Sequence, residues 1–246
     1  MTPSVPENVR AEMAPGGVLR ASVNYGNPVI AQRNPTGGAP RGVGAELARE
    51  LARRLGARIE YLEFDTAGKI ADEVKQGRID VAFLANDPQR ANEIAFTAPY
   101  VQIEGTYMVR ADSPARRVED MDRKGLRIAV GDKTAYDLFL TRAIKNAELV
   151  RAPTSADAIA LFQKERLDAV GGVKNPLVAI AAKDPAYRVI DGSFMVIGQA
   201  AGVPRAREAS ARYLRDFIEE MKASGFIERA LKESGVTDAT VAPAAK

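Results

Sequence analysis

The chain has 246 residues, of which 46% are hydrophobic and 27% charged, and its formal net charge is +3. This composition is typical of globular proteins with one large or two smaller domains, and no apolar stretch approaches the roughly 18 residues that a membrane-spanning helix needs. The chain has no cysteine and no histidine, which excludes disulfides, thiolate metal sites, cysteine nucleophiles and the commonest general base. Its lysines and arginines are scattered, so a nucleic-acid partner is not expected.

Strand-like and helix-like segments alternate along the first part of the chain. Leu47, Leu51 and Leu55 recur every fourth residue and form one apolar helical face, which Gly56 is suited to terminate. In chain order we expect a strand at 18–23, a helix ending at Gly56, a strand at 58–64, a helix ending at Gly77 and a strand at 79–84. This order predicts an α/β fold with mostly parallel sheets.

The same alternation begins again at residue 126. Thr134 with Asp137 and Thr154 with Asp157 have the spacing of a capping box, so each pair predicts the start of a helix. The remaining predictions are strands at 126–130 and 167–170, C-terminal helices around 214–221 and 227–231, and a frayed end at 237–246.

A short echo links the two series. The sequence Q-G-R-I-D-V at 76–81 is matched by K-E-R-L-D-A at 164–169, each at a helix-to-strand junction. The echo is weak alone, but its position in each series suggests two lobes of similar build. Apolar, strand-like stretches at 105–110 and 196–203 flank the second series and are interpreted as crossovers between the lobes.

These crossovers predict a discontinuous lobe 1, made of residues 1–104 and 200–246, and a lobe 2 of residues 105–199. A cleft between two such lobes is where ligands usually bind. The sequence has no phosphate-binding loop, no dinucleotide-binding glycine pattern and no calcium loop, so we expect no cofactor and no metal.

One group of motifs resembles a known family. The motifs are G-R-I-D-V at 77–81, Arg90 and I-A-F-T-A-P-Y at 94–100. Together they are similar to the signature of the type II periplasmic solute-binding proteins, specifically the polar amino-acid group (family 3 extracellular solute-binding proteins). The resemblance covers roughly residues 16–235. It implies two doubly wound α/β lobes joined by two hinge strands.

The resemblance also implies a function. A protein of this family is the substrate-binding component of an ABC importer and closes on a small amino-acid-like or carboxylate solute by hinge motion. We therefore expect a binding protein and not an enzyme. The protein is expected to act as a monomer together with a membrane permease, without entering the membrane itself. The expected location is the periplasm, although residues 1–17 show no signal-peptide pattern.

The resemblance places a carboxylate-binding arginine at Arg90, because a guanidinium matches a carboxylate in shape and charge. The segment before it is shorter than in the family, and Leu84, Ala85 and Asn86 stand where a serine or threonine is usual. The alternative is a surface arginine at a helix start. Thr134 matches a residue whose hydroxyl takes a carboxylate oxygen, and its alternative role is a plain N-cap.

Other candidate site residues follow strand ends. Asn24, Tyr25 and Asn27 come after the first predicted strand, and Phe64 and Asp65 end the second. The family's ammonium-binding acid is absent at Val173. The neighbouring Lys174 would favour an anionic ligand without an amino group, or is a solvated loop residue before a helix that starts at Asn175 and Pro176.

Two other functions stay open at this point. An enzyme similar to the cyclohexadienyl dehydratases would need an acid or base in the cleft, and the sequence supplies Glu46, Asp65, Asp87 and Lys174. A cytoplasmic ligand-sensing module is the other alternative, since no signal peptide is visible.

Overall fold

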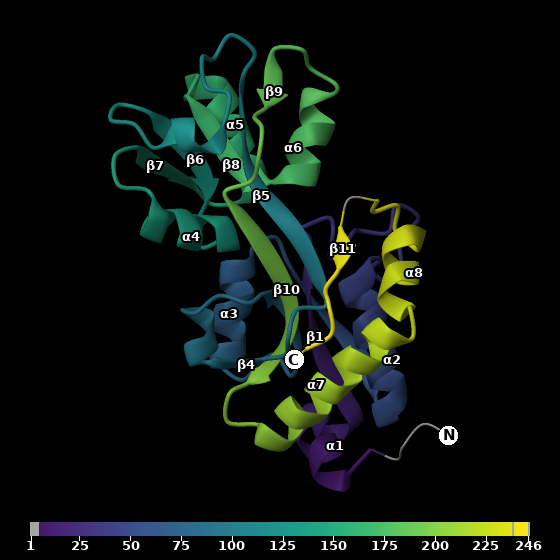
Figure 1. Ribbon diagram of the computed structural model, residues 1–246. Coiled ribbons are helices and arrows are strands. Elements are labelled where there is room, and N and C mark those ends of the chain that lie inside the picture. The colour runs from purple at the N-terminus through teal and green to yellow at the C-terminus, as the bar shows by residue number, and fades with distance from the viewer. Residues whose placement is uncertain (1–4, 238, 246) are drawn as a thin grey trace. The chain divides into compact units, whose positions relative to one another are not determined.

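The protein is described by a computed structural model that covers residues 5–237 and 239–245 (Figure 1). The chain divides into two compact units. Unit 1 contains the described residues up to Gln102 and those from Gly198 onward, and unit 2 is the continuous segment Ile103–Ile197. The sequence-based boundaries, after residues 104 and 199, lie two residues further along the chain at each crossing.

Unit 1 is an α/β unit built around strand β1. Strand β1 pairs in parallel with β2 in full register, from Val18 opposite Arg58 to Asn24 opposite Phe64. On its other side a single parallel bridge joins β1 to the segment before β3. The elements described here are α1 (Glu7–Met13), η1 (Pro15–Gly17), β1 (Val18–Asn24), α2 (Val43–Leu55), β2 (Arg58–Phe64), α3 (Ala67–Lys75), β3 (Ala82–Ala85), η2 (Arg90–Asn92), β4 (Ile94–Phe96), α7 (Glu208–Ala223), α8 (Phe226–Glu233) and β11 (Thr240–Val241).

Unit 2 also consists of alternating strands and helices. Strand β6 lies between β7 and β8 and is parallel to both, while β5 runs antiparallel to β8. The elements described here are η3 (Val118–Met121), β6 (Arg127–Gly131), α4 (Ala135–Ala143), β7 (Glu148–Ala152), α5 (Ser155–Glu165), β8 (Ala169–Val173), α6 (Lys174–Ala181) and β9 (Tyr187–Val189).

Two strands pass from one unit to the other. They are β5 (Val101–Arg110) and β10 (Met195–Pro204), which are neighbours in the sheet order. Within unit 1, β10 pairs antiparallel with β3 and β4, and β5 pairs with β11. The predicted crossover stretches are therefore strands, and each is longer than expected at its N-terminal end.

The predicted helix ends and starts follow their local chemistry. Helix α2 stops at Gly56, whose φ of 65° lies in the left-handed region that glycine adopts without a Cβ clash. The Thr134 and Thr154 hydroxyls accept hydrogen bonds from the Asp137 and Asp157 amides, at 3.1 and 3.0 Å. Both threonines are thus N-caps, as their spacing predicted.

The sequence echo corresponds to a repeated contact. The Asp80 amide donates to the Arg20 carbonyl at 2.9 Å, and the Arg20 amide donates back to the Asp80 carboxylate at 3.0 Å. The Asp168 amide donates to the Arg127 carbonyl at 3.0 Å, and the Arg127 amide returns a bond to the Asp168 carboxylate at 2.7 Å. Asp80 thus ties the segment before β3 to β1, and Asp168 ties the segment before β8 to β6. Both aspartates therefore have a structural role.

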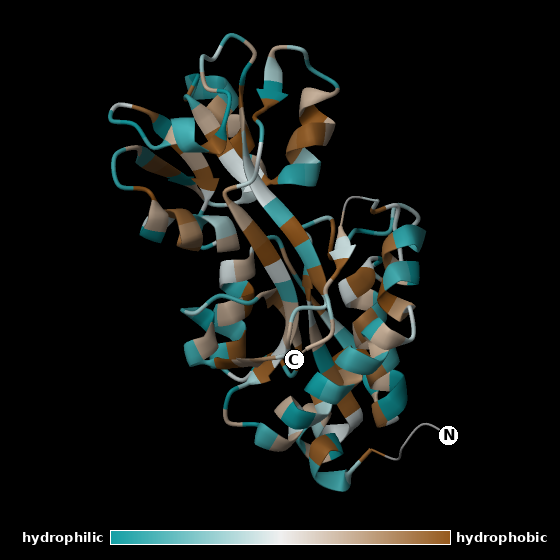
Figure 2. Ribbon diagram, in the orientation of Figure 1, coloured by the Kyte–Doolittle hydropathy of each residue, from teal (hydrophilic) through white to brown (hydrophobic). Residues whose placement is uncertain are grey.

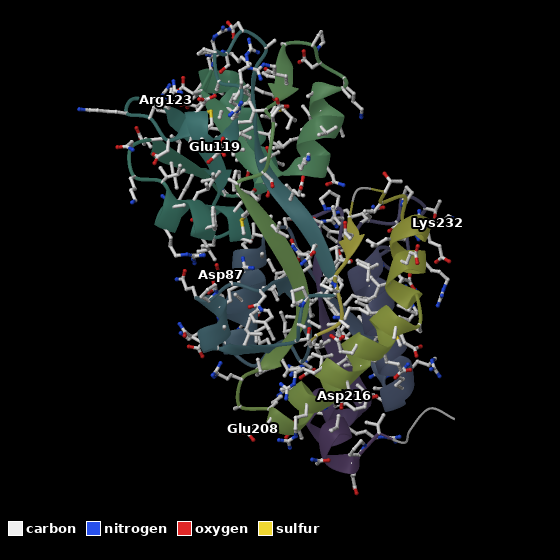
Figure 3. The ribbon with its side chains drawn as sticks, viewed as in Figure 1. Asp87, Glu119, Arg123, Glu208, Asp216 and Lys232 are labelled. Atoms are coloured by element: carbon white, nitrogen blue, oxygen red, sulfur yellow. The ribbon has the colours of Figure 1, made fainter. Side chains whose placement is uncertain are left out.

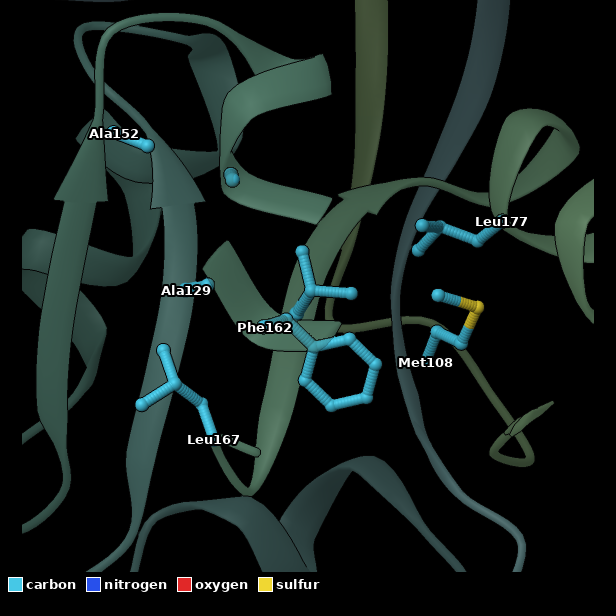
Figure 4. Packing of buried hydrophobic residues seen from close by; sticks show 8 residues of the cluster. Met108, Ala129, Ala152, Phe162, Leu167 and Leu177 are labelled. Carbon is cyan, nitrogen blue, oxygen red and sulfur yellow. The ribbon is translucent and has the colours of Figure 1, made fainter. Parts of the chain in front are cut away.

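Each unit buries its own core. In unit 2, α5 and α6 place Phe162 and Leu177 against Met108, Ala129 and the other buried residues of the cluster in Figure 4. In unit 1, the buried residues of α3 pack on those of β3 and β4. Helices α7 and α8 alternate hydrophilic and hydrophobic residues along their length (Figure 2), as expected for helices that bury one face.

The C-terminal tail corrects one prediction. The described part of residues 237–246 was expected to fray, but Thr240 and Val241 pair with Gln102 and Val101 as β11. The Ala242 amide also donates to the Tyr100 carbonyl at 3.0 Å. No helix within the described ranges combines the length and the apolar character that crossing a bilayer requires.

Candidate ligand-binding site

The carboxyl ends of β1 and β2 bring one group of predicted residues together. Because these strands are parallel and Asn24 lies opposite Phe64, their carboxyl ends meet at one edge of the sheet. The Tyr25 amide donates to the Phe64 carbonyl at 2.8 Å, which extends the pairing one residue further. At Gly26, a Cβ would lie 2.2 Å from the Asp65 carbonyl oxygen, so the close approach of the two loops requires glycine there.

The two asparagines are buried and hold the loop after β1. The Asn24 side-chain oxygen accepts from the Gly26 amide at 3.1 Å, and that of Asn27 accepts from the Val29 amide at 3.2 Å. These turns fix both side chains and orient their NH₂ groups away from the bonded amides. Neither NH₂ group has an acceptor among the residues that the structure describes.

Tyr25 and Asp65 belong to a polar cluster that Arg33 organises. The Arg33 guanidinium lies 4.0 Å from the centre of the Tyr25 ring and forms ion pairs of 3.2 Å with both Glu63 and Asp65. The Tyr25 hydroxyl donates to Glu63 at 3.0 Å. Partial burial, followed by this bond, raises the pKa of Tyr25 to about 12. With two carboxylates around one guanidinium, the cluster is net negative.

Phe64 differs from its neighbours. Its partly buried side chain packs against the buried cluster of α3, β3 and β4. It therefore contributes to the core of unit 1. Its role in ligand contact stays a prediction.

Arg90 is buried, with 6% of its surface exposed, which excludes the alternative of a surface arginine. It begins η2 just after β3, and its Nη1 donates to the Ala85 carbonyl at 2.9 Å. Burial lowers the pKa of the guanidinium to about 10, while the nearby Asp87 carboxylate favours its charged form. Asp87 is itself buried and accepts a bond from the Gln89 amide at 2.9 Å, which shapes the loop around the arginine.

The three residues before this loop have different positions. Leu84 and Ala85 are buried in β3, where they pair with Ala200 and Gln199 of β10. Asn86 is exposed and follows the strand, and its amide donates to the Gly198 carbonyl at 2.9 Å.

In unit 2, the Thr134 hydroxyl has two local partners. It accepts from the Asp137 amide and donates to the Gly131 carbonyl at 2.8 Å. The hydroxyl is therefore engaged as an N-cap, and its contact with a ligand stays a prediction.

Lys174 is not a loop residue. It is the first residue of α6, one position earlier than the predicted helix start, and its Nζ lies 2.5 Å from the Glu104 carboxylate. Both side chains are about half exposed, at 42% and 45%. Glu104 lies beside Gly105, which is opposite Val173 in the sheet, so a carboxylate from β5 stands next to the position where sequence reasoning found none.

Aromatic side chains in unit 2 were not singled out from the sequence. The Phe194 ring lies 4.6 Å from the Tyr107 ring centre and stacks on Phe139 at 6.1 Å. A Cβ at Gly105 would come within 2.8 Å of the Phe194 ring, so glycine makes room for it. Tyr107 is fully buried, and the partly buried rings of Phe139 and Phe194 supply an apolar surface.

Comparison with known protein families shows the family of this chain. The family model of the bacterial extracellular solute-binding proteins, family 3, matches residues 19–234. This chain belongs to that family. The family that the motifs around Asp80 and Arg90 indicated is thereby confirmed.

Relatives of this family 3 solute-binding protein include a glutamine-binding protein. The glutamine-binding protein of Geobacillus stearothermophilus is 23% identical over 183 residues, which are 72% of this chain and 69% of the relative. The probable ABC transporter extracellular-binding protein YckB of Bacillus subtilis (strain 168) is 34% identical over 99 residues, 39% of this chain and 33% of the relative.

Solved structures of similar fold cover almost the whole chain. A variant of ArgBP from T. maritima matches with a TM-score of 0.79 at 22% identity, covering 93% of this chain and all (100%) of that one. The solute receptor for L-cysteine of Neisseria gonorrhoeae matches with a TM-score of 0.79 at 20% identity, over 92% of each chain. These likenesses confirm the predicted type II periplasmic-binding-protein fold.

Proposed function

We propose that this family 3 solute-binding protein is the substrate-binding component of an ABC importer and binds a small amino-acid-like or carboxylate solute. The observation that carries this proposal is the placement of Arg90. The buried guanidinium donates to a backbone carbonyl at the carboxyl end of β3, and the Asp87 carboxylate favours its charged form, so the group is in place before any solute arrives. Such preorganisation suits bidentate capture of a carboxylate.

The proposed partners of the protein follow from its family. A glutamine-binding relative and a probable ABC transporter binding protein support an amino-acid-like solute and a membrane permease as partners. We further propose that the protein acts outside the cytoplasm as a monomer. Closure of the units about the two connecting strands, β5 and β10, would trap the solute.

The charge of unit 2 refines the solute class. With Glu104 against Lys174, unit 2 offers a paired cation and anion at the start of α6 instead of a lone cation. A zwitterionic amino acid carries the two complementary charges. We therefore propose that the solute is an α-amino acid and not a carboxylate that lacks an amino group.

The enzymatic alternative has no support from the groups that it would use. Glu46 is ion-paired with Arg49, Asp65 with Arg33 and Lys174 with Glu104, and Asp87 lies close enough to Arg90 to favour its charge. Each of these four groups is therefore already engaged with an oppositely charged side chain. A similar solved structure is an ancestral amino acid-binding protein described as a precursor of cyclohexadienyl dehydratase, with a TM-score of 0.76 at 21% identity.

The proposal is tested by substituting Arg90. We expect Arg90→Ala to weaken amino-acid binding by about 2 kcal/mol or more, since a carboxylate would lose a buried charged partner. Isothermal titration calorimetry over a panel of amino acids, keto acids and polyamines measures this. A solute at about 100 times its dissociation constant should also add roughly 2.7 kcal/mol of stability.

Because removal of a buried arginine also destabilises the fold, Arg207→Ala is the matched control. Arg207 donates to the buried Asp80 carboxylate at 2.8 Å and has no proposed contact with solute. Both variants should lose stability, and only Arg90→Ala should lose affinity. An unchanged dissociation constant in a folded Arg90→Ala protein, or binding of polyamines alone, would contradict the proposal.

A further inference from the structure

A hollow of about 570 Å³ lies within unit 1, between β4, η2 and the first half of α7. Its apolar floor comes from β4 and α7, and its rim carries cationic side chains. Glu208, at the start of α7 (Figure 3), is one of the residues that line it. The lining residues that matter here are Ile94, Phe96, Arg205, Glu208, Arg212 and Arg215.

Helix geometry explains why α7 presents its arginines to this hollow. Glu208, Arg212 and Arg215 are spaced by four and then three residues, so they share one face of the helix. Leu214 and Phe217 lie on the opposite face and are buried in unit 1. One side of α7 thus anchors the helix, and the other lines the hollow with charge.

Arg205 is held in position by the main chain. Its amide donates to the Glu93 carbonyl at 2.9 Å, and its Nη1 donates to the Ala91 carbonyl at 2.6 Å. The rest of its guanidinium has no further acceptor within the described ranges. A guanidinium carries five N–H donors, so most of its hydrogen-bonding capacity faces outward.

The two helix arginines are also short of partners. Arg212 is 3.9 Å from Glu208, too long for a hydrogen bond, and the two side chains are 65% and 82% exposed. Arg215 has no hydrogen bond or ion pair with any residue that the structure describes. The next two acids of α7, Asp216 and Glu219, do not line the hollow, and Glu219 is engaged by Lys222 at 2.5 Å. Three guanidiniums therefore face one glutamate around the rim.

We propose that this hollow is a docking surface for an acidic segment of a partner protein, in which carboxylates flank an apolar side chain. The arginines would take the carboxylates bidentately, and the floor formed by Ile94 and Phe96 would take the apolar side chain. A small-molecule pocket encloses most of its ligand behind mainly apolar walls. An open hollow with an exposed arginine rim instead matches protein interfaces, where arginine is enriched. The proposal does not depend on which solute the protein binds.

The test uses a fluorescent, end-capped peptide of sequence Glu-Glu-Phe-Glu-Glu and the full-length protein. Fluorescence anisotropy should show binding that weakens as salt is added. The double variant Arg212→Ala/Arg215→Ala should bind at least about fivefold more weakly. The double variant Arg10→Ala/Arg58→Ala is the matched control, because it removes two exposed arginines of unit 1 that lie outside the hollow. It should change affinity less than about twofold.

Three results would overturn the proposal. The first is equal binding by the wild type and the Arg212→Ala/Arg215→Ala variant, and the second is equal binding of a Lys-Lys-Phe-Lys-Lys peptide. The third is full displacement of the peptide by an equal concentration of 3-phenylpropionate, which would indicate a small-molecule site. Solute titrations on the same proteins separate this outcome from the transport proposal, because Arg212→Ala/Arg215→Ala should leave solute affinity unchanged.

Discussion

The ion pair between Lys174 and Glu104 sets the charge that unit 2 presents at the start of α6. The Lys174 side chain alone would add a cation there, but the carboxylate 2.5 Å away offsets it. Ion pairs of half-exposed side chains contribute little to stability, commonly less than about 1 kcal/mol. We therefore expect this pair to act on solute choice more than on folding.

Removing the acid should change solute preference. Glu104→Gln leaves Lys174 as an unpaired cation, so we expect weaker binding of amino acids and stronger binding of keto acids of the same side chain. Calorimetric titration of both solute classes measures the ratio of the two affinities. Glu119→Gln makes the same charge change on an exposed residue of unit 2 and should leave the ratio unchanged. If Glu104→Gln leaves the ratio of the two affinities unchanged, the ion pair of Lys174 and Glu104 does not belong to the solute site.

Two matched threonines separate capping from ligand contact. Thr134 and Thr154 each cap a helix of unit 2 by the same bond. Replacement of either by alanine should lower the free energy of unfolding by about 1 kcal/mol in urea titrations. We expect Thr134→Ala to weaken solute binding as well and Thr154→Ala to leave it intact. Equal affinities in the two variants would assign Thr134 to capping alone.

The sequence indicates which residues lie at neighbouring strand ends, but it does not indicate which distant side chains contact them. Asn24 and Asp65 follow strand ends, so the parallel arrangement of the strands was enough to bring them together. Arg33 comes from a long loop without periodicity, and Glu104 lies 70 residues from Lys174 in the chain. No local sequence pattern predicts the contacts of Arg33 or the contact between Glu104 and Lys174, because these contacts arise only in the tertiary fold.

Helices α2 and α7 are joined by a charged network. Arg54 contacts Glu50 on its own helix at 2.8 Å and Glu220 on α7 at 2.6 Å, and it lies over the Phe217 ring at 5.1 Å. Hydrogen bonds from Arg53 and Arg54 lower the pKa of Glu50 to about 2. Glu50 therefore favours the folded state wherever its carboxylate is charged.

This network predicts a dependence of stability on pH. The Glu50 pKa is lower in the folded than in the unfolded chain, so its stabilisation is complete above the unfolded value of 4.5 and is lost as the pH falls toward about 2. Glu50→Gln should cost roughly 2 kcal/mol at neutral pH, and the difference from wild type should shrink in acid. Urea denaturation across this range measures it. The exposed Glu165→Gln serves as control, and a difference that does not vary with pH would contradict the assignment.

Elements were predictable in proportion to their length and periodicity. Helix α2 repeats leucine every fourth residue and ends at a glycine, and both signals are local. Strand β11 has two residues and exists because β5 offers it an edge. Helix α1 is a single short amphipathic stretch whose buried side is defined by its contact with α7.

Two separate cores predict two separable unfolding units. Phe162 is 1% exposed in the core of unit 2, and its replacement by alanine should cost that unit about 3–5 kcal/mol. In hydrogen exchange read by mass spectrometry, we expect unit 2 peptides to lose protection in Phe162→Ala while unit 1 peptides keep theirs. Phe217→Ala should do the reverse. Equal loss in both units would show a single cooperative core.

Unit 2 is one uninterrupted segment, whereas unit 1 needs chain from both ends of the sequence. A ribosome therefore completes every strand of unit 2 before it has made the last strand and helices of unit 1. Domains fold as units while they are being synthesised. We expect the inserted half of this protein to reach its native packing first, and the enclosing half to wait until α7, which packs on α1 and β4, and α8, which packs on α2, have emerged.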